Sequence, residues 1–228
     1  MITSAKAPAA IGKAKPSEQF AHRALDLAGA VFGLVAAAPL MLMAAIGIGL
    51  NMGSPVLFRQ RRLGRSERAF TLLKFRTMRP PLDENGRQLS PSQRLTPTGR
   101  ILRQLSIDEL PQFWNVLRGD MSLVGPRPLY LEYLPYYTAR ERLRHAVRPG
   151  LTGLAQITGR NRAEWDDRLE MDVRYVEARS LWLDVSILLK TVVQVLRRED
   201  VMDTAIQGSL AKHRADRLSA AAGAESWR

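Results

Sequence analysis

The chain has 228 residues, a length that suits one well-packed domain with a short attached segment. It contains no cysteine, which excludes disulfide bonds and thiolate metal sites, and its three histidines, His22, His145 and His213, are too dispersed to predict a zinc site. The formal net charge of +12 favours a polyanionic partner, namely nucleic acid, anionic lipid or a phosphorylated substrate.

The N-terminal part of the sequence predicts a tail followed by a membrane segment. Residues 1–17 are rich in Ala, Lys, Pro and Ser and predict a mobile tail. An uncharged, mostly apolar run then extends from Leu27 to Leu50, which is long enough for a membrane helix. Pro39 lies at its midpoint and removes the backbone hydrogen bond to the carbonyl of Val35. Basic residues flank both ends of the run and draw both to the cytoplasm. We therefore expect a re-entrant membrane hairpin over residues 18–58, broken at Pro39, in preference to a spanning helix or a signal peptide.

Residues 59–200 are expected to form one cytoplasmic domain of the α/β class, mostly helical, with interfacial amphipathic helices. The composition of Phe70–Phe75 predicts a strand, and residues 79–98, with four prolines and Gly86, predict a loop. Helices are expected over Thr98–Leu105, Leu110–Leu117 and Leu181–Leu196.

Two segments of the C-terminal half are less clearly patterned. Four tyrosines followed by three arginines lie between Leu129 and Val147, and this mixture suits either a membrane interface or an ordinary surface helix. Residues 201–228 are expected to be a weakly ordered C-terminal extension. The sequence has no glycine-rich dinucleotide fingerprint and no phosphate-binding loop of the Walker type, which disfavours those nucleotide-binding folds.

Two adjacent acids, Asp108 and Glu109, lie in a stretch that is otherwise rich in arginine. In a structural interpretation they cap a helix, with Ser106 and Glu109 as a capping box. In a functional interpretation one carboxylate attacks a phosphorus atom or holds Mg²⁺, while arginines bind the phosphate oxygens. The pair alone does not decide between these interpretations. Asp172 and Asp184 similarly suit either ion pairs or a site.

Turns rich in glycine, proline and arginine follow this pair, and rigid turns of this kind suit diphosphate recognition. The motifs occur in a fixed order along the chain: Phe58-x-Gln60-x-Arg62-x-Gly64, Lys74-Phe-Arg-Thr-Met78, Ser106-x-Asp-Glu-Leu-Pro-Gln112, Asn115, Gly119-Asp-Met-Ser122, Val124-Gly-Pro-Arg-Pro128, Arg148-Pro-Gly150, Gly153 and Gly159-Arg-Asn161. In this order they resemble the bacterial sugar transferases, the monotopic phosphoglycosyl transferases, in their short form. The resemblance extends from about Arg23 to Arg198.

The resemblance implies a ping-pong reaction that starts from a UDP-sugar. The aspartate of the dyad, here Asp108, would attack the β-phosphorus, release UMP and carry the phosphosugar, which then passes to a polyprenyl phosphate such as undecaprenyl phosphate. Glu109 would assist with Mg²⁺ or with proton handling, so both acids are expected as metal ligands. The positions that the resemblance assigns to substrate binding are Lys74, Arg76, Arg103, Arg127, Arg160 and Asp184.

The resemblance also implies a place on the cytoplasmic face of the bacterial inner membrane, among its lipids, at the start of exopolysaccharide or other glycoconjugate synthesis. Ala38 stands where relatives commonly carry a serine before the proline, and Leu154 where many carry an aromatic residue. The sugar, the pathway and the oligomeric state, a homo-oligomer included, stay open, and nucleic acid is not an expected partner. The alternative is a basic membrane adaptor that binds anionic lipid or nucleic acid through charge alone. It does not account for an Asp-Glu pair among ordered arginine motifs.

Overall fold

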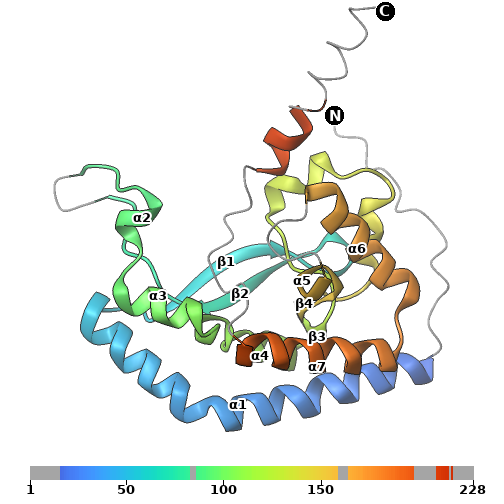
Figure 1. The fold of residues 1–228 in the computed structure, drawn as a ribbon, viewed down its shortest axis with the longest axis horizontal. Helices are drawn as coiled ribbons and strands as arrows, with labels where there is room; N and C mark the ends of the chain where they lie inside the picture. The colour runs from blue at the N-terminus through green and yellow to red at the C-terminus, as the bar shows by residue number, and fades with distance from the viewer. Residues whose placement is uncertain (1–15, 83–85, 159–163, 198–208, 216, 218–228) are drawn as a thin grey trace, which may run out of the picture.

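A single long helix, α1 (Pro16–Met52), runs along one side of the molecule (Figure 1). The computed structural model describes residues 16–82, 86–158, 164–197, 209–215 and 217, so nearly all of the predicted tail lies outside the described residues. Where the sequence predicts a hairpin over 18–58, the structure has one continuous helix with Pro39 inside it, bent near its middle. A proline inside a helix removes one hydrogen bond, and this bends the helix without necessarily ending it. Among the described residues, α1 is the helix with the length and composition to cross a membrane.

Glycines let α1 lie close to the rest of the protein. A Cβ atom at Gly29 would come 2.5 Å from Cδ1 of Leu123, and one at Gly33 would come 2.6 Å from Cζ of Phe113. These glycines therefore form notches in α1 that receive the two large side chains. Further along the helix, Ile48 is fully buried in a cluster that includes Leu102 and Ile107. Both halves of α1 thus pack against the rest of the described protein.

Polar side chains fix the first turns of α1. Arg23 donates hydrogen bonds to the carbonyl oxygens of Val116 (2.7 Å) and Leu117 (2.8 Å). Asp26, which is buried, accepts hydrogen bonds from the hydroxyl of Ser122 (2.7 Å) and the backbone N–H of Leu123 (2.8 Å). These contacts satisfy buried polar groups and hold the helix in one orientation.

Strands β1 (Leu57–Leu63) and β2 (Ala69–Phe75) form an antiparallel ribbon through the 3-10 turn η1 (Arg65–Glu67), and the strand predicted over 70–75 is confirmed. Leu57 pairs with Phe75 at one end of the ribbon. The other edge of β2 is covered by Asn115, whose side chain is fully buried. Its Oδ1 accepts from the N–H of Leu73 (3.0 Å), and its Nδ2 donates to the carbonyl of Thr71 (2.8 Å).

Helices α3 (Pro97–Gln104) and α4 (Gln112–Arg118) confirm the two helices predicted around the acidic pair, with the 3-10 turn η2 (Ile107–Glu109) between them. The segment predicted as a loop over 79–98 contains the short helix α2 (Pro91–Arg94) and projects from the body in Figure 1. Ser90 and Gln93 form a capping box there, which explains how so short a helix begins.

The parallel strands β3 (Ser122–Val124) and β4 (Gly150–Thr152) are joined by a segment that holds two 3-10 helices, η3 (Leu131–Tyr136) and η4 (Glu141–Ala146). In place of the surface helix that the sequence allows over Leu129–Val147, the structure has two short 3-10 helices, and the alternative of a membrane interface stays a prediction. Tyr133 and Tyr137 are buried in a cluster with Trp165 and Leu169, whereas Tyr130 and Tyr136 are exposed.

Helices α5 (Leu154–Thr158), α6 (Trp165–Ala178) and α7 (Leu181–Arg197) complete the body, and α7 confirms the helix predicted over 181–196. The main core joins β2, α4, β3, α6 and α7 through Leu72, Val116, Val124, Tyr175 and Ile187. Within the extension predicted over 201–228, residues 210–215 are helical and Leu210 is fully buried. The described residues form two two-stranded sheets and are otherwise mostly helical, so the expected α/β, mostly helical class is confirmed.

Candidate active site

Asp108 and Glu109, the dyad, lie in the η2 turn between α3 and α4. The turn follows Ser106, a non-glycine residue with a φ of 54°, a backbone conformation that is uncommon outside functional or tightly constrained positions. Asp108 is 8% exposed. Neither η2 nor α4 has a side-chain hydrogen bond at its cap, so helix capping does not account for the dyad.

Glu109 is held by two cations from distant parts of the chain. Lys74 of β2 places its Nζ 2.5 Å from Oε1 of Glu109, and Arg127 places its Nη2 2.6 Å from the same oxygen. Burial alone would raise the pKa of Glu109, but the charges of Arg127 and Lys74 outweigh burial and lower it. Glu109 is therefore a carboxylate throughout the physiological pH range.

Asp108 has the opposite electrostatic balance. Burial, and next the negative charge of Glu109, raise the pKa of Asp108 to about 6, against the opposing charges of Lys74, Arg103 and Arg127. At neutral pH Asp108 is mostly ionised, yet it is a stronger base than an ordinary aspartate. The two acids thus have distinct states, and perturbed pairs of this kind are typical of reactive sites.

The turn that carries Arg127 is fixed at its backbone. Gly125 donates to the carbonyl of Thr152 (2.9 Å), and Gly150 donates to the carbonyl of Pro126 (3.0 Å), which extends the pairing of β3 with β4 into the turn. A Cβ atom at Gly125 would lie 2.5 Å from the carbonyl oxygen of Arg148, so only glycine permits this approach. The Gly-Pro-Arg-Pro motif thus aims Arg127 at the dyad.

A buried ion pair lies behind the same turn. Arg144 of η4 is 2% exposed; its Nη2 donates to the carbonyl of Arg127 (2.7 Å) and to Oδ2 of Asp172 (2.6 Å). Its Nε also donates to Oδ2 of Asp172, at 3.0 Å. Of the interpretations that the sequence allows for Asp172, the structure shows the ion pair.

The other residues predicted to bind substrate occupy different places. Arg103 donates from Nε to the hydroxyl of Thr77 (2.9 Å), and its charge acts on Asp108. Arg76 instead donates to backbone carbonyls at the end of α1, those of Met52 and Gly53, and so caps that helix away from the dyad. Arg160 lies outside the described residues.

Asp184 is likewise not brought to the dyad. Its Oδ2 lies 2.6 Å from Nδ1 of His22, and its Oδ1 accepts from the hydroxyl of Tyr175 at 2.7 Å. The Tyr175 hydroxyl is also 3.1 Å from the carbonyl oxygen of Val124, just before the turn of Arg127. Asp184 therefore joins α1, α6 and α7 behind the site.

Sequence reasoning missed the polar residues of α1 and the role of Arg144. His22 and Asp26 are four residues apart and so share one face of the helix, and this spacing could have indicated a buried polar contact. Nothing in the sequence distinguishes Arg144 from its neighbours Arg140 and Arg142.

Comparison with known proteins places the chain in a family. Residues 17–198 match the family model described as bacterial sugar transferase. An uncharacterized sugar transferase, EpsL, of Bacillus subtilis is 50% identical over 182 residues, which cover 80% of this chain and 90% of the relative. A UDP-glucose:undecaprenyl-phosphate glucose-1-phosphate transferase of Caulobacter vibrioides is 45% identical, with 78% of this chain and 70% of the relative covered. The UDP-N-acetylgalactosamine-undecaprenyl-phosphate N-acetylgalactosaminephosphotransferase of Aeromonas hydrophila is 40% identical, and only 45% of its length is covered.

These matches define the class of protein as a phosphoglycosyl transferase, the enzyme class expected from the sequence. The chain belongs to the bacterial sugar transferase family.

Proposed function

We propose that the chain transfers a sugar 1-phosphate from a UDP-sugar to undecaprenyl phosphate, with release of UMP, as an early step of exopolysaccharide or other glycoconjugate synthesis. Three relatives named as undecaprenyl-phosphate transferases of N-acetylgalactosamine, glucose or galactose phosphate support this reaction. The observation that carries the proposal is the dyad with two cations on Glu109 and a carboxyl of raised pKa at Asp108.

Asp108 is the nucleophile in this proposal. Its carboxylate attacks the β-phosphorus of the UDP-sugar, the bond from that phosphorus to the bridging oxygen breaks, and UMP leaves with the oxygen. The phosphosugar remains on Asp108 until a phosphate oxygen of undecaprenyl phosphate attacks the same phosphorus and frees the carboxylate. Glu109 is a weaker candidate, because both cations already neutralise its Oε1.

The positive charges of Lys74, Arg103 and Arg127 offset the electrostatic repulsion between the two reactants. A carboxylate that attacks a diphosphate meets two like charges, and their repulsion is strong at a partly buried site. Lys74, Arg103 and Arg127 all lower the pKa of Asp108, so each acts electrostatically at the point of attack. Fixed positive charges there stabilise the charge that develops on the phosphoryl oxygens.

The donor chemistry of the dyad fits Mg²⁺. This ion typically binds through one or two carboxylates together with water and substrate phosphates. Among the described residues there is no cluster of three or more acidic, histidine or cysteine side chains that would cage a metal. Asp108 and Oε2 of Glu109 would hold the ion, which supplies charge neutralisation for the diphosphate. A chelator should abolish UMP release, and added Mg²⁺ should restore it.

We also propose that α1 is re-entrant, so that residues 59–200 form a catalytic domain on the cytoplasmic face of the inner membrane. Contacts of both halves of α1 support this topology, because His22 pairs with α7 while Ile48 packs near α3. A spanning helix would place its ends on opposite sides of the bilayer. Large apolar side chains are exposed on α1 and α7 and suit a lipid environment: Phe32, Val35, Leu50, Trp182 and Leu196.

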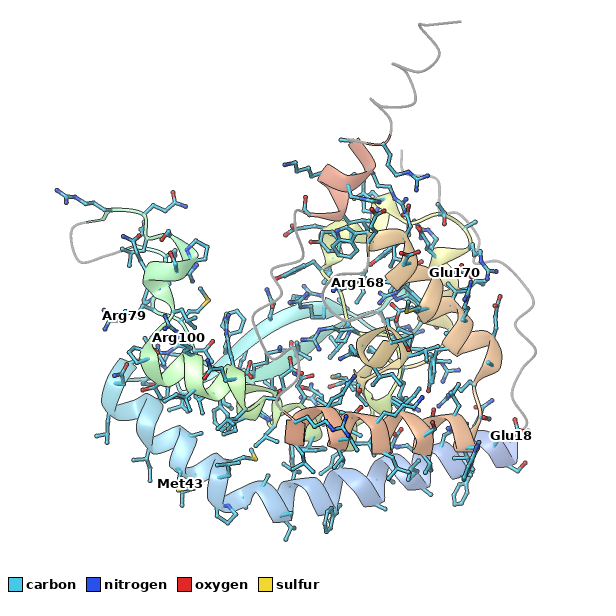
Figure 2. The ribbon with its side chains drawn as sticks, viewed as in Figure 1. Glu18, Met43, Arg79, Arg100, Arg168 and Glu170 are labelled. Atoms are coloured by element: carbon cyan, nitrogen blue, oxygen red, sulfur yellow. The ribbon has the colours of Figure 1, made fainter. Side chains whose placement is uncertain are left out.

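Single cysteines test this topology, because the chain has none of its own. Glu18→Cys, at the start of α1 (Figure 2), and Arg65→Cys, in η1, are both exposed positions. In inverted vesicles that expose the cytoplasmic face, a membrane-impermeant maleimide should label both. In intact spheroplasts it should label neither, and labelling of one residue from each side would contradict the re-entrant arrangement.

The reaction is tested by UMP release from a panel of UDP-sugars, with Mg²⁺ and undecaprenyl phosphate. Release should depend on the sugar and should be lost in Asp108→Asn, a change of nearly the same size. A basic adaptor, the alternative, would show no turnover and would be indifferent to this substitution. An Asp108→Asn enzyme with undiminished turnover would rule out the aspartate intermediate.

A further inference from the structure

An apolar cavity of about 420 Å³ lies between the middle of α1, the β1–β2 ribbon and the start of α4. On α1 its lining includes Leu34 and Met41, which stand on either side of Pro39, so the cavity occupies the bend of the helix. Its walls are formed by Met41 and Ala45 of α1, Leu73 and Phe75 of β2, and Pro111 and Trp114 at the start of α4. The lining is almost entirely hydrocarbon.

The cavity and the dyad are built from the same short segments. Pro111 follows Glu109 by two residues, and two residues of chain span at most about 7 Å between Cα atoms. Leu73 and Phe75 flank Lys74, the residue that binds Glu109. Successive side chains of a strand point to opposite faces, so the cation and the apolar wall lie on the two faces of one strand. A ligand passing the end of β2 at Pro111 would contact both.

We propose that this cavity binds the isoprenoid chain of the acceptor, in the part next to its phosphate. The inference rests on the proposed function and assigns a site to its second substrate. An acceptor with an anionic head and a hydrocarbon tail complements a place where Lys74 and Arg127 stand beside an apolar cavity. The UDP-sugar is polar throughout and does not match this lining. Because α1 forms one wall, the remainder of the tail can continue into the bilayer.

Two tryptophan substitutions on α1 test the proposal. Ala45→Trp fills the cavity, whereas Met43→Trp adds the same group on the lipid-facing side, where Met43 is 62% exposed and points away from the domain (Figure 2). In detergent, with saturating UDP-sugar, Ala45→Trp should raise the KM for undecaprenyl phosphate by about tenfold or more. The KM for the UDP-sugar, and the UMP released in one turnover without acceptor, should match those of Met43→Trp.

A second variant covers the case in which Ala45→Trp does not fold. Trp114→Ala removes a wall from a half-exposed position, and it should also raise the acceptor KM while UMP release without acceptor is retained. Acceptor KM values in Ala45→Trp or Trp114→Ala equal to that of Met43→Trp would overturn the proposal. Weaker binding to phospholipid vesicles with an unchanged acceptor KM would also overturn it, because the cavity would then hold an acyl chain of the bilayer. Wild-type protein that releases no UMP from any UDP-sugar would instead refute the proposed function.

Discussion

Arg144 donates a hydrogen bond from Nη2 to the backbone carbonyl of Arg127 at 2.7 Å, and Arg127 in turn contacts Glu109 with its own guanidinium. Asp172 neutralises Arg144 in the interior. The position of Arg127 thus depends on the ion pair of Arg144 with Asp172, which itself does not contact the dyad. We regard Arg144 and Asp172 as positioning residues for Arg127.

Asp172→Asn should impair both stability and turnover. It leaves the buried guanidinium of Arg144 uncompensated, and breaking a buried pair in this way costs about 3 kcal/mol. In protein that remains folded, kcat for UMP release should fall, because the turn that carries Arg127 shifts. Glu170→Gln on the same helix is the control: water screens its exposed pair with Arg140, so the change should leave stability and kcat nearly unaffected (Figure 2). A normal kcat in folded Asp172→Asn would show that the action of Arg127 at the dyad does not depend on the ion pair of Arg144 with Asp172.

The pH dependence of UMP release should report the state of Asp108. A nucleophilic carboxylate must be ionised, and its pKa is raised to about 6, so single-turnover rates should fall tenfold for each pH unit below about 6. In Glu109→Gln the negative charge beside Asp108 is gone, which lowers the pKa of Asp108 and moves this acid limb to lower pH. The overall rate should also fall, because Lys74 and Arg127 lose their partner. An acid limb at the same pH in both proteins would mean that another group controls it.

Two glycine-to-alanine changes should differ in their effect on stability. At Gly99, at the start of α3, a Cβ atom would overlap the carbonyl oxygen of Thr77, so Gly99→Ala must displace backbone and should destabilise the protein by about 2 kcal/mol. At Gly49, in α1, no atom lies within 4 Å of the added Cβ, and Gly49→Ala should be neutral or stabilising by up to about 1 kcal/mol. Thermal unfolding in detergent measures both. Equal midpoints would show that α3 does not depend on this contact.

Acid should destabilise the protein through His145. Burial, then the charge of Arg144, lowers the pKa of His145 to about 3 from 6.5, so between these values the unfolded chain binds the extra proton. Stability therefore rises with pH across this window, and at pH 5 the loss relative to neutral pH is about 2 kcal/mol from this group alone. His145→Gln should flatten the pH dependence of the unfolding midpoint between pH 6.5 and 5. An unchanged slope would assign the acid sensitivity to the carboxyl groups instead.

The elements that follow from local pattern were predictable from the sequence, and those set by distant contacts were not. The strand over 70–75 and the helices on either side of the dyad follow from side-chain type and spacing. The pattern of Leu129–Val147 did not predict two 3-10 helices or the burial of Tyr133 and Tyr137, because an aromatic–arginine mixture has the same local pattern at a membrane interface and in a partly buried segment. The buried cluster of Tyr133 and Tyr137 with Trp165 depends on tertiary packing, which no local rule encodes.

The candidate site was likewise only partly predictable from the sequence. The motif order indicates that Lys74 and Arg127 belong near the dyad, and both contact Glu109. Lys74 and Arg76 are two residues apart, and on an uninterrupted strand they would share one face. β2 ends at Phe75, so Arg76 turns instead to the last carbonyls of α1. The pairing of His22 with Asp184 joins segments that are far apart in the sequence, a contact that composition cannot reveal.

Asn115 has a consequence for the self-association of the protein. A two-stranded ribbon leaves an outer row of backbone N–H and C=O groups, which can pair with a strand of another chain and start aggregation. One buried amide occupies both the N–H of Leu73 and the carbonyl of Thr71 at that row. Helix α4 thereby takes the place of a third strand, and the outer edge of β2, the strand that carries Lys74, is closed to edge-to-edge assembly at these residues.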